Sequence, residues 1–473
     1  MSFNEFFKKA PSLRPTPNLG CLLDIPTGRY RKGKYGEHIL NGGLSYLTGI
    51  GGMGNTFKST VGHFMILRPL SRMVNTFANI YDSEISLTMD RLVNLAYDMD
   101  NIGNGELAFS DRLVLTDKTT QSANDWFDSF KSFLKEKRKN VKQSTATTPF
   151  IDSSGAPIVS FVPSFFEIDS LSQMDFDVVL SMQEKNEVGS SGMNMEAMKA
   201  ASAKSQMLNQ MPGLTGGSGA YVVMTAHIGE EHQLDPYSPP KKKLSFLKGK
   251  LKFKNVPEKI TFLTNNCWFV NSAKPLQNQT TKGAEYPKSR DAVVAGDTDL
   301  HVLQIINLRA KNGPTGMPFE LIVSQNEGVL PGLSEFHHIK QHNRFGLGGN
   351  DRNYYVELCP DIALQRTSVR SKIEENPKLQ RALEITSELC QIKYLWHDID
   401  PSILCEPKEL YDDLKAKGYD WDRLLNTRGW WTYEGWEPED LPFLSTMDLL
   451  MMRQKDGYHP YWYDSPGTKK KNK

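Results

Sequence analysis

The spacing of hydrophobic and polar residues predicts alternating strands and helices over most of the chain. Short apolar runs bounded by turn residues are typical of buried strands, and apolar residues three or four positions apart are typical of amphipathic helices. Strands that alternate with helices indicate a parallel sheet flanked by helices, so we expect an α/β fold. Strands are expected at 44–52, 76–84, 112–117, 165–170 and 220–229, and helices at 86–99 and 122–139.

The pattern divides the chain into three expected parts. An N-terminal arm or oligomerisation segment over 1–43 is broken by prolines, and its residues 3–9 form either a small helix that docks on a neighbouring subunit or a loosely held arm. A main domain over 44–344 includes a hairpin within 149–174. Past about residue 345 the pattern changes to helices and Trp/Tyr-rich loops, which predicts a smaller, mainly helical C-terminal domain with a basic tail over 345–473. Further strands are expected at 260–270, 300–311 and 318–329.

Composition narrows the class of protein only modestly. The 473 residues are 39% hydrophobic with a net charge of +1, so affinity for a polyanion must come from local patches. The five cysteines are odd in number and lack CxxC spacing, which argues against a disulfide framework or a zinc ribbon. No apolar stretch approaches 18 residues, and no leader is recognisable at the start. We expect a cytoplasmic protein with no membrane contact.

The stretch "GGMGNTFKST" at 51–60 nearly matches the phosphate-binding pattern GxxxxGK[ST]. Such a loop aims backbone N–H groups at phosphate oxygens, places Lys58 on the β- and γ-phosphates, and puts the Ser59 hydroxyl on Mg²⁺. Phe57 replaces the second glycine, but its backbone N–H remains. The alternative is a glycine-rich turn that binds no nucleotide. The expected nucleotide-binding residues are Gly52, Met53, Gly54, Asn55, Thr56, Phe57, Lys58, Ser59 and Thr60.

Two later strands end in carboxylates that fit the same site. The strand at 165–170 delivers Asp169 at its carboxyl end, where an acid can hold the water shell of Mg²⁺. The strand at 76–84 ends in Asp82 and Glu84, and a carboxylate there can orient or deprotonate the attacking water. Each acid alone could equally begin a helix. All three features in this order on parallel strands favour a nucleotide-hydrolysing site.

The segments "GNTFKS" and "YDSE" together resemble the RecA recombinase superfamily, and specifically its phage UvsX branch. The resemblance implies a RecA-like P-loop NTPase core with ATP and Mg²⁺ as cofactors. It implies that Glu84 is the catalytic glutamate, Lys58 the phosphate lysine, and Asp169 with Ser170 the Walker B pair. In "VVMTAHIG", His227 takes the place of the γ-phosphate sensor. RecA proteins generally carry glutamine there.

The resemblance also gives roles to two flexible segments, since 186–196 resembles the first DNA-binding loop and 229–256 the second. Lysines interleaved with aromatic residues can neutralise phosphates and stack bases, which suits salt-sensitive binding of single-stranded DNA. The alternative is a solvated lysine face. The lysines expected to bind DNA are Lys241, Lys242, Lys243, Lys248, Lys250, Lys252 and Lys254.

By the same resemblance, which covers about residues 40–340, Arg309 and Lys311 reach the ATP of a neighbouring subunit and stabilise charge there. The implied function is a DNA-dependent ATPase that assembles as a homo-oligomeric helical filament on single-stranded DNA and pairs it with duplex DNA. Mediator and single-strand-binding proteins are possible partners, and a phage-encoded chain would act in the host cytoplasm.

Two other functions stay open. "RAKNGPTG" at 309–316 resembles a segment of DnaB-like replicative helicases, which close into hexameric rings. The position of the loop, about 50 residues into the chain, is expected to leave no room for a helicase N-terminal domain. The third possibility is a non-enzymatic mediator with a degenerate nucleotide site, which would require Lys58 or Glu84 to have no function.

Overall fold

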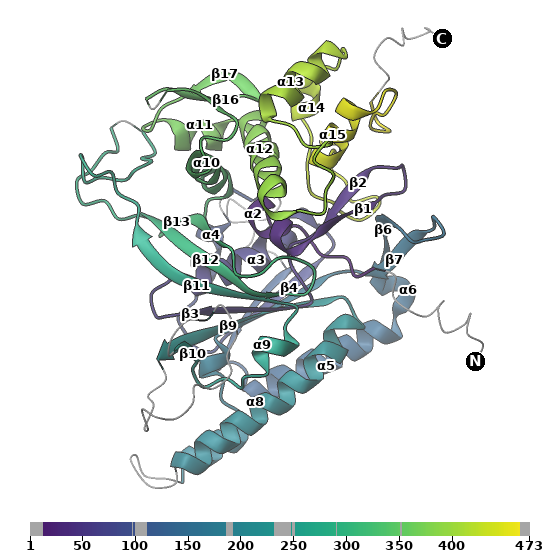
Figure 1. Cartoon of the computed structure of the whole chain (residues 1–473). Helices are drawn as coiled ribbons and strands as arrows, with labels where there is room; N and C mark the ends of the chain where they lie inside the picture. The colour runs from purple at the N-terminus through teal and green to yellow at the C-terminus, as the bar shows by residue number, and fades with distance from the viewer. Residues whose placement is uncertain are drawn as a thin grey trace.

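A ten-stranded sheet forms the centre of the computed structural model, which describes residues 13–96, 98–99, 111–185, 193–230, 247, 251–289, 291–350 and 352–463 (Figure 1). The strand order is β14-β13-β12-β11-β3-β9-β8-β4-β5, and β10 pairs with β9. Strands from β5 to β11 in this order run parallel, and the strands from β12 to β14 are antiparallel additions. The predicted α/β class with a mostly parallel sheet is confirmed.

In sheet order the strands are β14 (Gly328–Val329), β13 (Pro318–Ser324), β12 (Leu300–Ala310), β11 (Asn266–Pro275), β3 (Leu47–Gly52), β9 (Ala220–Glu230), β8 (Ser164–Asp169), β4 (Phe77–Asp82) and β5 (Leu113–Asp117), with β10 at Leu251–Phe253. Except for β11, the expected strands therefore lie close to their predicted positions. The predicted hairpin is also present, as β6 (Thr145–Ile151) paired with β7 (Pro157–Phe161).

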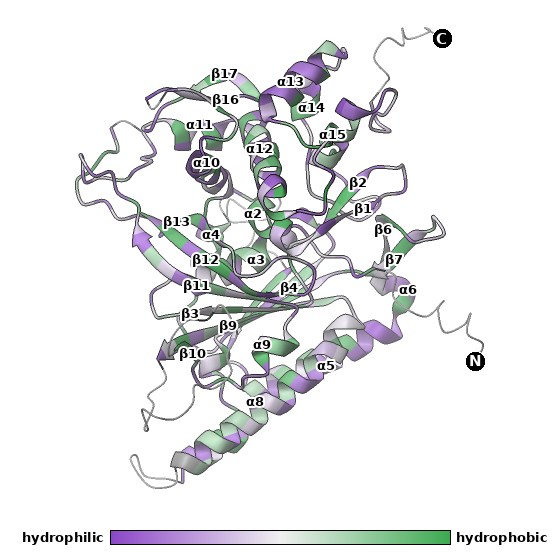
Figure 2. Cartoon of the chain, viewed as in Figure 1, coloured by the Kyte–Doolittle hydropathy of each residue, from purple (hydrophilic) through white to green (hydrophobic). Residues whose placement is uncertain are grey.

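Helices cover both faces of the sheet. On one face α3 (Lys58–Arg72) and α4 (Met89–Leu95) bury apolar residues such as Phe64 and Leu92 against the sheet. On the other face α5 (Ala123–Lys139) and α8 (Met193–Gly216) lie side by side (Figure 1). Hydrophilic and hydrophobic residues are mixed along α5, as expected for a helix with one face on the sheet and one in solvent (Figure 2). The smaller helices on this side are α6 (Val141–Ser144), α7 (Asp177–Gln183) and α9 (Ile260–Leu263).

Glycines let the layers approach closely around β3. A Cβ added at Gly51 would lie 2.5 Å from Ile228 Cδ1, and one added at Gly62 would lie 2.4 Å from Glu167 Oε1. Both distances are far inside van der Waals contact, so a larger side chain would push the neighbouring strand or helix away. Gly62 brings α3 close to β8, and Gly51 makes room for Ile228 of β9 beneath the end of β3, where the loop to α3 begins.

The C-terminal region is mainly helical, as expected, and packs around a second apolar core to which Leu300 of β12 and Ile322 of β13 also contribute. It also contains a small three-stranded sheet. The helices are α10 (Pro331–Gln341), α11 (Val369–Glu375), α12 (Pro377–Leu395), α13 (Pro407–Ala416), α14 (Trp421–Leu425) and α15 (Thr446–Gln454), and the strands are β15 (Leu347–Gly349), β16 (Tyr354–Val356) and β17 (Cys359–Leu364).

The N-terminal segment contacts this C-terminal region. It forms α2 (Cys21–Asp24) and the paired strands β1 (Arg29–Lys32) and β2 (His38–Asn41). The indole Nε1 of Trp431 donates to the backbone oxygen of Thr16 at 3.0 Å. The boundaries at residues 43 and 344 remain predictions. The expected helix at 3–9 lies outside the described residues.

One predicted strand begins later than expected. Residues 260–263 form α9, and β11 starts only at Asn266. The hydroxyl of Thr264 donates to the Ile260 backbone oxygen at 2.7 Å and closes the turn. An apolar run this short suits a helical turn as well as a strand, so periodicity alone could not separate them. None of the helices within the described ranges combines the length and apolarity needed to cross a membrane.

Candidate nucleotide site

The residues predicted to bind nucleotide meet at the carboxyl ends of four neighbouring parallel strands. Strands β3, β9, β8 and β4 are adjacent in the sheet and point the same way. Their carboxyl ends therefore share one edge, the usual position of ligand sites in such sheets. The glycine loop follows β3, His227 lies near the end of β9, Asp169 ends β8, and Glu84 follows β4.

The glycine loop leads directly into α3, which begins at Lys58. The first intrahelical bond runs from the Val61 N–H to the Phe57 backbone oxygen, at 3.0 Å. The amides before Val61 have no earlier carbonyl in the helix, so they are the donors that a helix N-terminus offers to an anion. Lys58 is buried, whereas Met53 and Asn55 are exposed.

Phe57 adopts the backbone conformation that the missing glycine would take. Its φ of 60° and ψ of 21° lie in the left-handed region, which a bulky residue occupies at a cost of roughly 1–2 kcal/mol. The ring packs against the core of the α3 face, and its centroid lies 4.8 Å from that of His301. The loop therefore keeps a glycine-like backbone, with the aromatic ring anchored on β12.

Ser59 and Asp169 lie close enough to share a metal ion. The Ser59 hydroxyl donates to Asp169 Oδ1 at 3.1 Å, and Thr225 on β9 donates to the same oxygen. A hydroxyl and a carboxylate are hard oxygen ligands of the type that Mg²⁺ prefers. The residues present therefore fit the metal expected from the sequence. The Asp169–Ser170 peptide bond is cis.

A buried histidine and glutamate support Asp169 from inside the protein. His63 on α3 lies 3.0 Å from Glu167 Oε2 through Nδ1 and 3.8 Å from Asp169 Oδ2 through Nε2. Burial alone would lower the pKa of His63, but the two carboxylates reverse the effect and raise it. Burial raises the pKa of Glu167. Sequence reasoning missed both residues, although a glutamate inside the apolar run "FFEID" was a visible signal.

Glu84 and Asp82 have different surroundings. Asp82 accepts the backbone N–H groups of Glu84, Ser86 and Leu87 at 2.6–2.8 Å, so it holds the turn after β4. Glu84 instead faces the site with its side chain 30% exposed, which leaves it accessible to water. Of the two acids that end this strand, Glu84 is thus the one placed for chemistry.

Two hydrogen bonds orient the Glu84 carboxylate. Ser170 Oγ donates to Glu84 Oε1 at 2.9 Å, and His227 Nε2 lies 3.0 Å from the same oxygen. Burial by itself would raise the pKa of Glu84. The hydrogen bonds from His227 and Ser170 and the charge of Lys58 outweigh it and lower this pKa. The ionised form, which a base requires, is therefore favoured.

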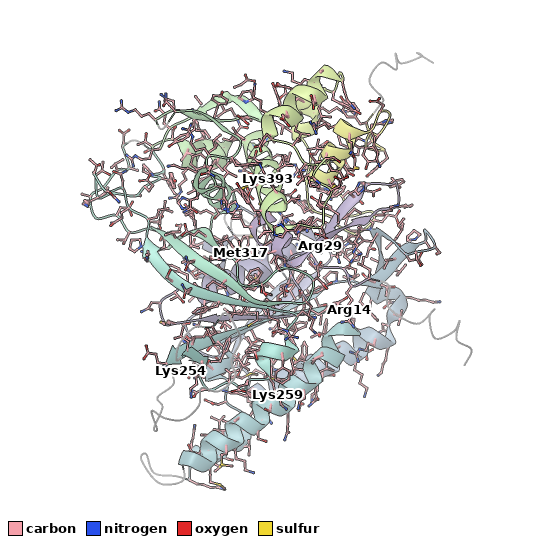
Figure 3. The ribbon with its side chains drawn as sticks, in the orientation of Figure 1. Arg14, Arg29, Lys254, Lys259, Met317 and Lys393 are labelled. Atoms are coloured by element: carbon pink, nitrogen blue, oxygen red, sulfur yellow. The ribbon has the colours of Figure 1, made fainter. Side chains whose placement is uncertain are left out.

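His227 connects this site to the segment expected to bind DNA. Its backbone N–H donates to Ser172 Oγ at 2.9 Å, and its backbone oxygen accepts the Lys254 N–H at 2.8 Å. Lys252 lies on β10 opposite Gly229 of β9 (Lys254 is labelled in Figure 3). The segment at 229–256 therefore starts from β9 and pairs with the same strand again near its other end. Lys241, Lys242, Lys243, Lys248 and Lys250, like most of 186–196, lie outside the described residues.

Arg309 and Lys311 lie at the other end of the sheet. Arg309 pairs with Cys267, which pairs with Gly49, whereas the loop leaves β3 at Gly52. Three residues of strand separate these levels by roughly 10 Å along the axis. The chain therefore does not bring this basic pair to its own glycine loop. Burial and the charges of Arg309 and Arg14 lower the pKa of Lys311, so three cationic side chains gather here.

Comparisons with known proteins leave the family open. No family model matches the chain, and no curated protein matches it. Among solved structures, the chain is similar to the crystal structure of the RadB recombinase, with 14% sequence identity and a TM-score of 0.32. That match covers 61% of this chain and 92% of the other. A similarity of this size assigns neither family nor function.

Proposed function

We propose that this protein is a Mg²⁺-dependent ATPase of the RecA-like recombinase type, acting as a filament on single-stranded DNA. The observation that carries the proposal is the meeting of Lys58, Ser59, Asp169 and Glu84 at one sheet edge. This set contains a cationic side chain that can bind phosphate, two hard oxygen ligands for a metal ion, and an ionised base that water can reach. Phosphoryl transfer needs these three kinds of group.

In the proposed reaction each residue acts on a defined part of ATP. The amides of the glycine loop and Lys58 hold the β- and γ-phosphates, while Ser59 and Asp169 hold Mg²⁺ directly or through its water shell. Glu84 accepts a hydrogen bond from the attacking water and aims it at the γ-phosphorus. Mg²⁺ held by Ser59 and Asp169 would supply positive charge against the charge that develops on the phosphate oxygens.

The Glu84–His227 contact offers a means of coupling hydrolysis to DNA. A γ-phosphate near His227 Nε2 would compete with Glu84 for the 3.0 Å contact between them. His227 also bonds through its backbone to Lys254, at the end of the segment that carries the predicted DNA-binding lysines. Loss or gain of the phosphate would thereby change the anchoring of this segment.

Arg309 and Lys311 complete the proposed site from a neighbouring subunit. Their position at the opposite end of the sheet suits a head-to-tail assembly, in which one edge of each subunit faces the other edge of the next. Such an interface yields a helical filament when the rotation does not close and a ring when it does. A DnaB-like hexameric helicase is therefore the second candidate. It is favoured by the segment at 309–316, which turns between β12 and β13 with the Gly316 N–H bonded to the Asn307 oxygen at 2.8 Å.

Electron microscopy and ATP hydrolysis test the proposal together. With ATP, Mg²⁺ and single-stranded DNA, we expect helical filaments and a hydrolysis rate that rises with DNA. Closed six-fold rings would favour the helicase, and hydrolysis indifferent to DNA would contradict both. Lys58→Ala should abolish DNA-stimulated hydrolysis, and Lys139→Ala, an exposed lysine on α5, is the matched control.

The DNA-binding assignment has a separate test. Replacing the lysines of 241–254 should reduce DNA affinity and the steepness of its salt dependence, because each lost phosphate contact lowers the slope by about one. ATP affinity should stay nearly unchanged. An unaltered salt slope would show that these lysines form only a solvated face.

A further inference from the structure

Two histidines and a cysteine lie together between α10 and α12, outside the nucleotide site. His338 and His342 are one helical turn apart at the end of α10, and Cys390 projects from α12. One nitrogen of each imidazole and the thiol sulfur all lie within 4.8 Å of one another. His338 and Cys390 are buried and His342 is partly exposed, so the cluster lies just beneath the surface.

Within the described part of the chain, the hydrogen bonds of His342 leave one of its ring nitrogens available for a ligand. His342 Nδ1 lies 2.8 Å from the backbone oxygen of His338, which can only accept. Nδ1 must therefore carry the proton, and in the neutral ring Nε2 then carries a lone pair. A backbone carbonyl that fixes the tautomer in this way is the usual support of a metal-binding histidine.

One ring nitrogen of His338 is buried without a hydrogen-bond partner among the described residues. The residue is only 6% exposed, yet within the described part of the chain its Nε2 has no hydrogen-bond partner. Buried polar atoms of this kind are rare, and a bound water or ion is a common reason for them. The atom thus points to an occupant beside α10.

A cavity of about 50 Å³ adjoins the two histidines. Its lining includes His338, His342 and Tyr394, together with Asn307 on β12 and Met317 before β13 (Met317 is labelled in Figure 3). Among the described residues, Asn307 Nδ2 is also buried and unpaired. A volume of this size holds a water molecule, and the two unpaired groups would bond to it or to a metal-bound water.

We propose that His338, His342 and Cys390 bind a zinc ion, with a fourth coordination position open to this cavity. Two imidazoles and one thiolate match the ligand preferences of Zn²⁺, and three protein ligands plus water form an open tetrahedral site. Zinc–ligand bonds of about 2.0–2.3 Å set neighbouring ligand atoms roughly 3.5 Å apart in a tetrahedron. The observed ligand atoms lie within 4.8 Å of one another, so the cluster contracts by no more than about 1.3 Å, which the partly exposed His342 side chain permits.

The competing explanation for the unpaired polar atoms is a cavity that holds water and no metal. Titration with Co²⁺ distinguishes a metal site from such a cavity. Cobalt occupies zinc sites, and its bond to a thiolate gives a sulfur-to-metal charge-transfer absorption. The full-length, tag-free protein, stripped with a chelator and reduced, is titrated with Co²⁺ in excess Mg²⁺. The Mg²⁺ keeps Co²⁺ from the oxygen ligands Ser59 and Asp169, and binding at His63 would give no sulfur band.

We expect one equivalent of Co²⁺ with the sulfur band, displaced by Zn²⁺. Cys390→Ala should remove the band, and His342→Gln should weaken binding at least tenfold, since even supporting residues of metal sites change affinity by 10–100-fold. Two matched controls should keep wild-type binding. They are Cys405→Ala, the partly exposed cysteine outside the cluster, and His337→Gln, whose ring faces Glu320 instead.

Specific outcomes would overturn the proposal. They are a wild-type titration without the sulfur band, a band that persists in Cys390→Ala, or unchanged affinity in His342→Gln. Because His342 is partly exposed, its glutamine variant should keep the fold, which circular dichroism of the metal-free protein checks. Metal content and the cobalt spectrum are independent of ATP hydrolysis, so failure here leaves the proposed ATPase untouched.

Discussion

The two ends of the central strands carry different chemistry. At the carboxyl end, the acids Asp82, Glu84, Glu167 and Asp169 are each bonded to backbone amides, hydroxyls or histidines. At the amino end, burial and the charges of Arg309 and Arg14 lower the pKa of Lys311, so positive charges lie close together there. One end can hold a metal–phosphate complex, whereas the other can offer cations to an anion.

If the proposed function holds, each end supplies one half of a nucleotide site. The carboxyl end has a metal position and a base, but transition-state charge on a phosphoryl group is usually countered by a further cation. The amino end has such cations with the Arg309 Nε buried and unpaired within the described residues. Two copies stacked end to end would join the halves, so the sharpest experiments test each half separately and then together.

The largest effect is expected when the cationic end is removed. Arg309→Ala combined with Lys311→Ala should lower ATP hydrolysis by about 10³-fold or more, because a cation supplied in trans contributes 10³–10⁵ in rate. ATP binding to the other end should be retained. Steady-state hydrolysis and equilibrium binding of a fluorescent nucleotide measure the two quantities. If the double variant fails to fold, Lys311→Ala alone still tests the cationic end, because Lys311 is exposed and its replacement leaves the core intact.

Mixing inactive variants tests whether the ends act across subunits. Chains with Glu84→Gln still carry Arg309 and Lys311, and chains that lack the basic pair still carry Glu84. In a random head-to-tail filament about a quarter of the interfaces combine two intact halves, so about a quarter of the wild-type rate should return. No recovery on mixing would contradict a shared site.

Glu84→Gln should reduce hydrolysis by about 10²–10³-fold, since a positioned general base contributes 10²–10⁴. ATP affinity should change little, because Glu84 is proposed to act on the water rather than on the phosphates. Single-turnover hydrolysis beside nucleotide binding separates these effects. Glu136→Gln on the exposed side of α5 is the matched control, and equal rates for Glu84→Gln and the control would refute the base.

A smaller effect is expected from His227→Leu, whose side chain cannot donate a hydrogen bond and which therefore tests how the pKa of Glu84 is lowered. The hydrogen bond from His227 is the largest influence that lowers the pKa of Glu84 against its burial. Without it this pKa should rise, and the ionised base should be lost at a higher pH as the solution is acidified. The acid limb of the pH–rate profile should therefore move to higher pH. A limb that does not move would show that Glu84 does not govern it.

The elements of the sheet could be predicted from the sequence because each is a local pattern. The runs ending at Asp82, Asp169 and His227 are apolar and short, and the structure has a strand at each. The late start of β11 could not be predicted, since the apolar residues 260–263 satisfy either a strand or a helical turn. Hydrogen bonds with Leu47, Ile260 and their neighbours decide that point, and these are contacts of the folded chain.

Residues of the candidate site could be predicted from the sequence only where they lie next to a recognisable motif or at the end of a predicted strand. Lys58 and Ser59 follow the glycine loop, and Asp169 ends its strand, so spacing was enough to nominate them. His63 and Glu167 lie inside a helix and a strand, and their meeting depends on Gly62 letting α3 approach β8. The sequence likewise separates His338 from Cys390 by about 50 residues, and only the packing of α10 on α12 joins them.

The smallest effect concerns the loop itself, where Phe57 has a left-handed backbone at the start of α3. Phe57→Ala and Phe57→Gly both remove the ring and its contact with His301, but only glycine also relieves the backbone strain. Alanine in this conformation costs roughly 1 kcal/mol more than glycine, so Phe57→Gly should be more stable than Phe57→Ala by about 1 kcal/mol. Denaturant unfolding in the absence of nucleotide measures the difference. If alanine proves as stable as glycine, the loop does not hold the glycine-like backbone on which its phosphate-binding amides depend.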